Sequence, residues 1–125
     1  MSRRLLAPLL MMGVIFWFSA QPFDGDELAW WEVVGRNLGH FAGYALLAAA
    51  WAWALAGRVR GPLAPAAVLS LIYAVSDEYH QTFVAGRTGT WEDVLIDGLG
   101  IATSLLLIRV RQSRRSSAEP HPVET

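Results

Sequence analysis

Titratable side chains follow an apolar run in the second half of the chain, at Asp77, Glu78 and His80. Two carboxylates and an imidazole at this spacing can exchange protons with a bound molecule or bind a divalent ion. His40 and Tyr44 stand four residues apart in an earlier apolar stretch, so in a helix they share one face. Such chemistry needs a frame that brings these residues together, and the surrounding apolar stretches are the elements to provide it.

Further polar positions lie close to these in sequence. Asp93 and Asp97 fall on a later apolar segment, and Arg87 stands in a glycine-containing loop before it. A guanidinium pairs well with carboxylates and with phosphate. The candidate ligand-binding residues are His40, Tyr44, Asp77, Glu78, His80, Gln81, Arg87, Asp93 and Asp97.

Several of these residues also have plain structural interpretations. Asp93 follows Thr90 at the spacing of a helix capping box and would then only satisfy backbone donors. Glu78 points about 100° away from the preceding carboxylate on a helix and could face water at the rim of a site. His40 and Tyr44 could form a hydrogen-bonded pair between helices without any chemistry.

Four apolar stretches supply the frame, in a chain that is 54% hydrophobic and only 17% charged. Each is close to the roughly 20 residues that cross a hydrocarbon core of about 30 Å. We therefore expect an all-α, polytopic membrane protein, a four-transmembrane-helix bundle in which Gly100 is a close-packing position. The expected spans are about 5–20, 38–57, 63–84 and 91–110.

Two flanking segments complete the single expected domain, residues 1–111. Leu28, Trp31 and Val34 recur at helical spacing beside acidic residues. This pattern predicts a short outer interfacial helix over 26–36, between the first and second spans. Residues 112–125 are polar with two prolines, and they predict a disordered cytoplasmic tail.

Arginine placement predicts the orientation of the spans. Eight of the ten arginines flank one side, whereas Arg36, Arg87 and nine of the eleven acids lie on the other. Because cytoplasmic loops carry the excess of basic residues, both termini are expected in the cytoplasm. The expected location is the cell inner (cytoplasmic) membrane, as a multi-pass protein.

The first span has a competing interpretation. Arg3 and Arg4 before an apolar run resemble the start of a secretory signal. Phe18 stands where a cleavage site needs a small residue, and cleavage would leave an odd number of spans. We therefore expect the first span to be retained.

The polar candidates all fall at one depth under this topology, near the outer boundary of the bilayer. A carboxylate inside the membrane costs roughly 2.5–3.5 kcal/mol, so several carboxylates together require partners or water. Two histidines and Arg87 lie at the same depth. We therefore expect a polar pocket between the helices that opens toward the outside.

The longest motif resembles a known family. The segment from Asp77 to Arg87, D-E-Y-H-Q-T-F followed by V-A-G-R, and the later Asp93 and Gly100 are similar to the signature of the VanZ-like family. His40 and Tyr44 match its H-x-x-x-Y, and Ser19-Ala20-Gln21-Pro22 resembles the end of its first helix. The resemblance covers about residues 5–110, and it departs from the family at Asp97, where asparagine is common.

The resemblance implies a cell-envelope membrane protein, with an association with teicoplanin (glycopeptide) resistance that has no established mechanism. The expected partners are membrane lipids and a lipid-linked cell-wall precursor, which the pocket would bind or modify. A homo-oligomer is compatible with the sequence. The arginine-rich C-terminal flank is explained by anionic lipid heads, so we expect no nucleic-acid binding.

An enzyme acting on a lipid-linked phosphate is the alternative. Asp77 could orient His80 or His40 as a general base while Arg87 stabilises phosphoryl charge. These four residues are the catalytic candidates, although no nucleophile motif accompanies them. Asp77, His80 and Asp97 could also ligate a divalent ion, but they follow no established metal-ligand spacing, and we predict neither a metal site nor a cofactor.

Overall fold

The computed structural model describes residues 3–20, 30–83 and 91–118, and this part of the chain is helical without strands. A short 3-10 helix η1 (Arg3–Leu5) leads into α1 (Leu6–Ser19), which is followed by α2 (Trp30–Leu55), α3 (Leu63–Gln81) and α4 (Trp91–Ala118). The all-α class expected from the sequence is confirmed. Helices α1 and α3 coincide closely with the predicted spans 5–20 and 63–84, whereas α2 begins earlier and α4 ends later than predicted.

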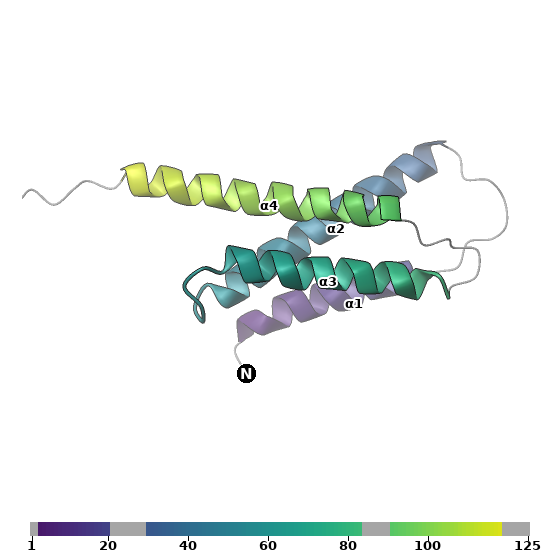
Figure 1. The fold of residues 1–125 in the computed structure, drawn as a ribbon, viewed down its shortest axis with the longest axis horizontal. Coiled ribbons are helices and arrows are strands. Elements are labelled where there is room, and N and C mark those ends of the chain that lie inside the picture. Colours follow the sequence, from purple (N-terminus) through teal and green to yellow (C-terminus); the bar gives the residue numbers. More distant parts are fainter. Residues whose placement is uncertain (1–2, 21–29, 84–90, 119–125) are drawn as a thin grey trace, which may run out of the picture.

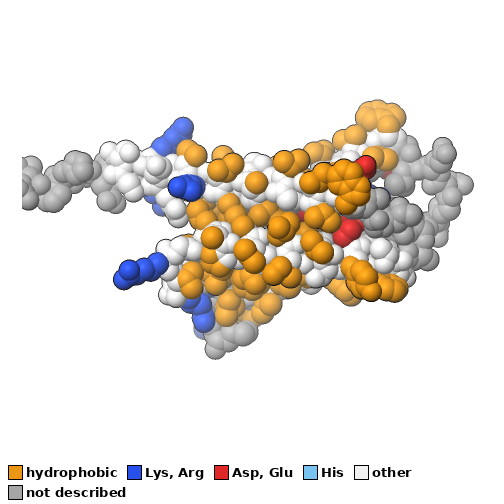
Figure 2. All heavy atoms as spheres, in the orientation of Figure 1, with side chains coloured by type: hydrophobic (Ala, Val, Ile, Leu, Met, Phe, Trp, Pro, Cys, Tyr) orange, Lys and Arg blue, Asp and Glu red, His pale blue; other side chains and the backbone are white. Residues whose placement is uncertain are grey.

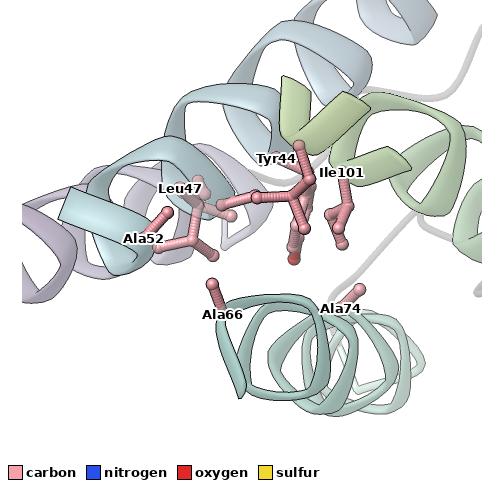
Figure 3. Close-up of a cluster of buried hydrophobic side chains, with 9 residues drawn as sticks. Tyr44, Leu47, Ala52, Ala66, Ala74 and Ile101 are labelled. Atoms are coloured by element: carbon pink, nitrogen blue, oxygen red, sulfur yellow. The ribbon is translucent and has the colours of Figure 1, made fainter. Parts of the chain in front are cut away.

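Helix α2 is the central element of the bundle (Figure 1). It crosses the other helices and packs against α1, α3 and, most extensively, α4. The core beneath it contains Tyr44, Leu47 and Ala52 of α2 together with Ala66 and Ala74 of α3 and Ile101 of α4 (Figure 3). Many of these side chains are alanine, and small side chains let helix backbones approach closely.

Large apolar side chains cover the outside of the helices as well (Figure 2). Each of the four helices exposes several, among them Leu10, Trp53, Ile72 and Leu106. An apolar surface of this extent is unusual for a protein surrounded by water. Among the described helices, α2 alone is both long enough and apolar enough to qualify as a membrane span by length and composition.

Two boundaries differ from the sequence prediction. The predicted interfacial helix over 26–36 is not a separate element in its described part, because α2 already begins at Trp30 and runs without a break to Leu55. No proline interrupts this stretch, so the helical pattern around Trp31 and Val34 continues directly into the span. Arg36 consequently belongs to the same helix as His40.

Helix α4 is longer than predicted. It continues to Ala118, so residues 112–118 are helical where the sequence predicts a disordered tail. Arginine and glutamine are good helix formers, and the first proline after the helix begins is Pro120. The rest of the predicted tail, 119–125, lies outside the described residues.

Charged side chains separate toward the two ends of the bundle. In Figure 2 the arginines gather at the end where α4 runs out, and the visible carboxylates lie at the opposite end. The carboxylate end is where α1 and α3 finish and where α2 and α4 begin (Figure 1). Four helix ends therefore contribute side chains to one region.

Candidate functional site

A buried hydrogen-bond cluster joins three helices at the carboxylate end. Asp77, in the penultimate turn of α3, is 4% exposed. Its Oδ2 accepts hydrogen bonds from the Ser19 hydroxyl of α1 and the Tyr44 hydroxyl of α2, each at 2.9 Å. The Gln81 amide, one turn later on α3, donates to Ser19 Oγ at 3.4 Å. These bonds compensate the cost of burying the carboxyl group.

A histidine–aspartate pair lies beside this cluster. His40 Nδ1 of α2 is 2.9 Å from Oδ1 of Asp97 of α4, and Asp97 is fully buried. The His40 and Tyr44 rings stack with their centroids 6.5 Å apart. A carboxylate that accepts from Nδ1 fixes the tautomer of the ring and leaves Nε2 to act on a bound molecule.

A second charge pair links the same two helices. Nη2 of Arg36 is 3.0 Å from Oδ2 of Asp93, and both side chains are partly buried. Arg36, His40 and Tyr44 follow one another at four-residue spacing, so they form one stripe along α2. Each of the three contacts a different carboxylate.

Gly100 allows α2 and α4 to approach closely enough for these pairs. A Cβ at this position would lie 2.3 Å from the Phe41 carbonyl oxygen, a distance that no side chain tolerates. The predicted close-packing role of Gly100 is thus confirmed. Phe41 follows His40 directly, so this contact fixes the separation of His40 and Asp97.

A cavity of about 430 Å³ lies between α1 and α2, within the range of small-molecule sites. The α1 residues that line it are mostly apolar: Met11, Val14, Ile15, Phe18 and Ser19. The α2 residues that line it combine glycines with the polar stripe: Gly35, Arg36, Gly39, His40, Gly43 and Tyr44.

The structure brings together most of the predicted site residues, in pairs that differ from the predicted ones. The carboxylate beside His40 is Asp97, whereas the sequence argument offered Asp77 as the residue that could orient either His80 or His40. Asp93 contacts Arg36, and the proposed cap at Thr90 lies outside the described residues, as does Arg87.

Two further candidate residues, Glu78 and His80, lie in the last turn of α3. Glu78 is 8% exposed and therefore does not face water as the rim interpretation expects. The His80 ring packs on Phe16 with centroids 4.7 Å apart. Its buried Nδ1 has no hydrogen-bond partner among the described residues. Nor does the described part of the chain gather three His, Cys, Asp or Glu side chains that could hold a metal ion.

Two residues in these contacts, Ser19 and Arg36, were not among the candidate site residues. Ser19 ends a purely apolar helix and shows no spacing relation to Asp77, 58 residues away; only its place in the family-like Ser-Ala-Gln-Pro segment could have pointed to it. Arg36 was placed on a separate surface helix, although its four-residue spacing from His40 was a usable signal.

The side chains on the cavity-facing side of α2 could transfer a proton and bind an anion. His40, backed by Asp97, can accept or donate a proton at Nε2, and Arg36 can bind an anionic oxygen. Both side chains line the cavity. The second oxygens of Asp77 and Asp97 are buried without a partner among the described residues, which is typical of sites that also hold water or a polar ligand.

A family model, VanZ/LLP1, matches residues 5–112, nearly the whole chain. The chain belongs to the VanZ/LLP1 family. The resemblance inferred from the Asp77–Arg87 motif is thereby confirmed, and the family is membrane-associated. No curated protein and no solved structure matches the chain.

Proposed function

We propose that this VanZ/LLP1 protein is a four-span protein of the inner membrane whose carboxylate end faces outward. It would bind or modify, at the α1–α2 cavity, a lipid or lipid-linked cell-wall precursor with a phosphate group. The observation that carries the proposal is that Arg36 and His40 line one cavity whose other walls are mostly apolar. A site of that composition suits an amphipathic anion.

The surface of the bundle supports four spans. Large apolar side chains are exposed on every helix, and burial in lipid removes the cost of exposing them to water. At about 1.5 Å per residue, α3 with 19 residues and α4 with 28 are long enough for a hydrocarbon core of about 30 Å. Helix α1 has 14 residues and is extended at its start by η1.

The arginines support the orientation. Arg58 and Arg60 follow α2, and Arg109, Arg111 and Arg114 lie in the C-terminal half of α4, at the end opposite to the carboxylates. Basic residues are retained on the cytoplasmic side. The cavity-lining Arg36 would then lie near the outer leaflet.

Lipid co-purification tests the binding function. We compare the phospholipids retained by the wild-type protein, Arg36→Gln and the matched control Arg109→Gln, which removes an exposed arginine at the other end. Loss of one charged hydrogen bond, worth about 1.5 kcal/mol, corresponds to roughly a tenfold loss of affinity. We expect that loss of anionic lipid for Arg36→Gln alone. Equal retention by both variants would contradict the proposal.

Catalysis is the second candidate, and the 2.9 Å contact between His40 and Asp97 favours it. In this version His40 Nε2 takes a proton from water while the water oxygen attacks the terminal phosphorus of a lipid-linked pyrophosphate. The bond from that phosphorus to the bridging oxygen breaks, the bridging oxygen takes the proton back from His40, and lipid phosphate and inorganic phosphate result. Release of phosphate from such a lipid, present with wild type and absent with His40→Gln, tests it. No release with wild type would leave binding as the function.

Glycopeptide resistance is the cellular consequence that family membership leads us to propose. A protein that binds or modifies a lipid-linked cell-wall precursor would alter the teicoplanin concentration that stops growth of a sensitive host. Wild type and Arg36→Gln are expressed at equal levels, so that a change in the inhibitory concentration caused by overexpression of any membrane protein appears in both. If the wild-type protein, Arg36→Gln and the empty host all show the same inhibitory concentration of teicoplanin, a role in resistance is ruled out.

A further inference from the structure

Asp77 differs from the two other aspartates at the carboxylate end of the bundle. Asp93 lies 3.0 Å from the Arg36 guanidinium, and Asp97 lies 2.9 Å from the His40 ring. Asp77 forms no ion pair with any described residue, and its Oδ2 accepts hydrogen bonds from two neutral hydroxyl groups instead. A buried carboxylate needs an opposite charge, so the described residues leave the charge of Asp77 unbalanced.

Two acceptor atoms beside this charge have no donor. The second oxygen of Asp77, Oδ1, is buried and has no hydrogen-bond partner among the described residues. Gln81 lies four residues later, on the same face of α3; it is fully buried, and its Oε1 also has no partner there. The Gln81 amide donates at 3.4 Å to the Ser19 hydroxyl that binds Asp77. The amide and the carboxyl group therefore meet at Ser19, and each keeps one buried oxygen unused.

A small positive charge would supply what both observations lack. A water molecule could donate to the two oxygens, but it would leave the charge of Asp77 unbalanced. Hard cations take oxygen ligands from carboxylate and amide groups alike. The described residues do not gather three His, Cys, Asp or Glu side chains around one point for a metal ion. One carboxylate with neutral oxygens therefore favours a monovalent cation over a multivalent one.

We propose that Asp77 Oδ1 and Gln81 Oε1 bind one small monovalent cation at the junction of α1, α2 and α3. The inference does not depend on the lipid binding proposed above, because neither residue lines the α1–α2 cavity. Ser19 and Tyr44, which donate to Asp77, do line that cavity, so the cation reaches the site from there. Since Asp77 joins the three helices, the bound cation stabilises their junction.

Sodium and the proton are the two sources of such a charge, and a pH titration alone does not distinguish them. The described part of α1, from Leu6 to Ser19, has no ionisable side chain. The other helices bring several ionisable groups near Asp77: His40 and Tyr44 of α2, Tyr73, Glu78 and His80 of α3, and Asp93 and Asp97 of α4. The sodium ion and the proton are therefore measured separately.

Thermal unfolding of the purified full chain tests sodium. Sodium chloride is replaced by choline chloride at constant ionic strength and pH, because the choline cation is too large for an enclosed site. If sodium binds, the unfolding midpoint of the wild type rises by roughly 5 °C for each tenfold increase in sodium above the dissociation constant. Asp77→Asn and Gln81→Leu should lose this rise. The matched control Asp93→Asn, which removes a carboxylate with its own cationic partner, should keep it.

Infrared spectroscopy at neutral pH tests the proton. If the proton is the cation, the midpoint does not respond to sodium, and the wild type shows the carbonyl stretch of a protonated carboxyl group that Asp77→Asn loses and Asp93→Asn keeps. The inference is overturned if the wild type shows neither a sodium response nor such a band, or if Asp77→Asn retains whichever of the two the wild type has. If Asp77→Asn does not fold, Gln81→Leu decides, because it removes the second oxygen and must lower the sodium response or shift the band.

Discussion

The two sides of α2 use glycine in opposite ways. Toward α4, Gly100 lets the backbones touch, and the charge pairs His40–Asp97 and Arg36–Asp93 span the contact. Toward α1, Gly35 and Gly39 border open space in the cavity. The first interface holds the charged side chains in place, and the second leaves the space into which Arg36 and His40 face. Substitutions of similar size should therefore have very different effects on the two sides.

The largest effect is expected for His40→Ala. Asp97 is fully buried, and removing its partner leaves a buried carboxylate uncompensated. Breaking such a pair lowers the free energy of unfolding by about 3–5 kcal/mol. Chemical unfolding in detergent micelles measures the change, and the double variant with Asp97→Ala should recover part of it. A loss below about 1 kcal/mol would show that the pair is not a structural link between α2 and α4.

Gly100→Ala should cost about 3 kcal/mol, at the upper end for overpacking. The new Cβ meets the Phe41 carbonyl oxygen at 2.3 Å, and backbone cannot move aside as a flexible side chain does. Gly98→Ala, two residues earlier and open, is the matched control and should not destabilise the protein. Similar unfolding midpoints for both variants would mean that α2 and α4 are further apart than the structure has them.

Tyr44→Phe should cost about 1.5 kcal/mol, because it removes one of the two hydrogen bonds to Asp77 Oδ2. The matched control is Tyr73→Phe, which removes a bond to the Met12 carbonyl oxygen and should cost about 1 kcal/mol or less, as for a neutral pair. Only Tyr44→Phe should also weaken the contact between α3 and α2, which would be detected as faster amide hydrogen exchange in the last turn of α3. A larger loss of stability for Tyr73→Phe than for Tyr44→Phe would contradict the conclusion that Asp77 joins the three helices.

The smallest effect is expected for Gly39→Ala on the cavity side. With no atom within 4 Å of its Cβ, alanine only reduces the freedom of the unfolded chain, which stabilises by about 0.4–1 kcal/mol. The same unfolding assay measures it. A clear loss of stability would mean that α1 lies against Gly39 and that the two sides of α2 do not differ.

The all-α frame, and the nearness of several candidate residues to one another, could be predicted from the sequence. Apolar runs located the helices, and the spacing of His40 and Tyr44 placed them on one face, close to Asp77 and Asp97. Which carboxylate meets which partner depends on the rotation of each helix and on the separation that Gly100 permits. Neither quantity is encoded in residue spacing, so the sequence offered Asp77 as a partner of His80 or His40, whereas Asp77 binds Ser19 and Tyr44.

There are also physical reasons why the sequence did not reveal Ser19 and Arg36. Ser19 is a single polar residue at the end of an apolar helix, and its partner lies on α3. Arg36 was separated from His40 by an expected helix boundary that does not exist, since α2 begins at Trp30. A continuous helix through Gly35 and Gly39 is difficult to predict because glycine lowers local helix propensity.

The most direct test of the central claim, that the cavity end faces outward, uses the absence of cysteine from the chain. Single variants Glu92→Cys, at the carboxylate end, and Ser113→Cys, on the arginine-rich part of α4, both replace exposed residues. Right-side-out membrane vesicles are treated with a membrane-impermeant maleimide before and after lysis. We predict that Glu92→Cys is labelled in intact vesicles and that Ser113→Cys is labelled only after lysis. The reverse pattern, or labelling of both before lysis, would contradict the outward-facing site.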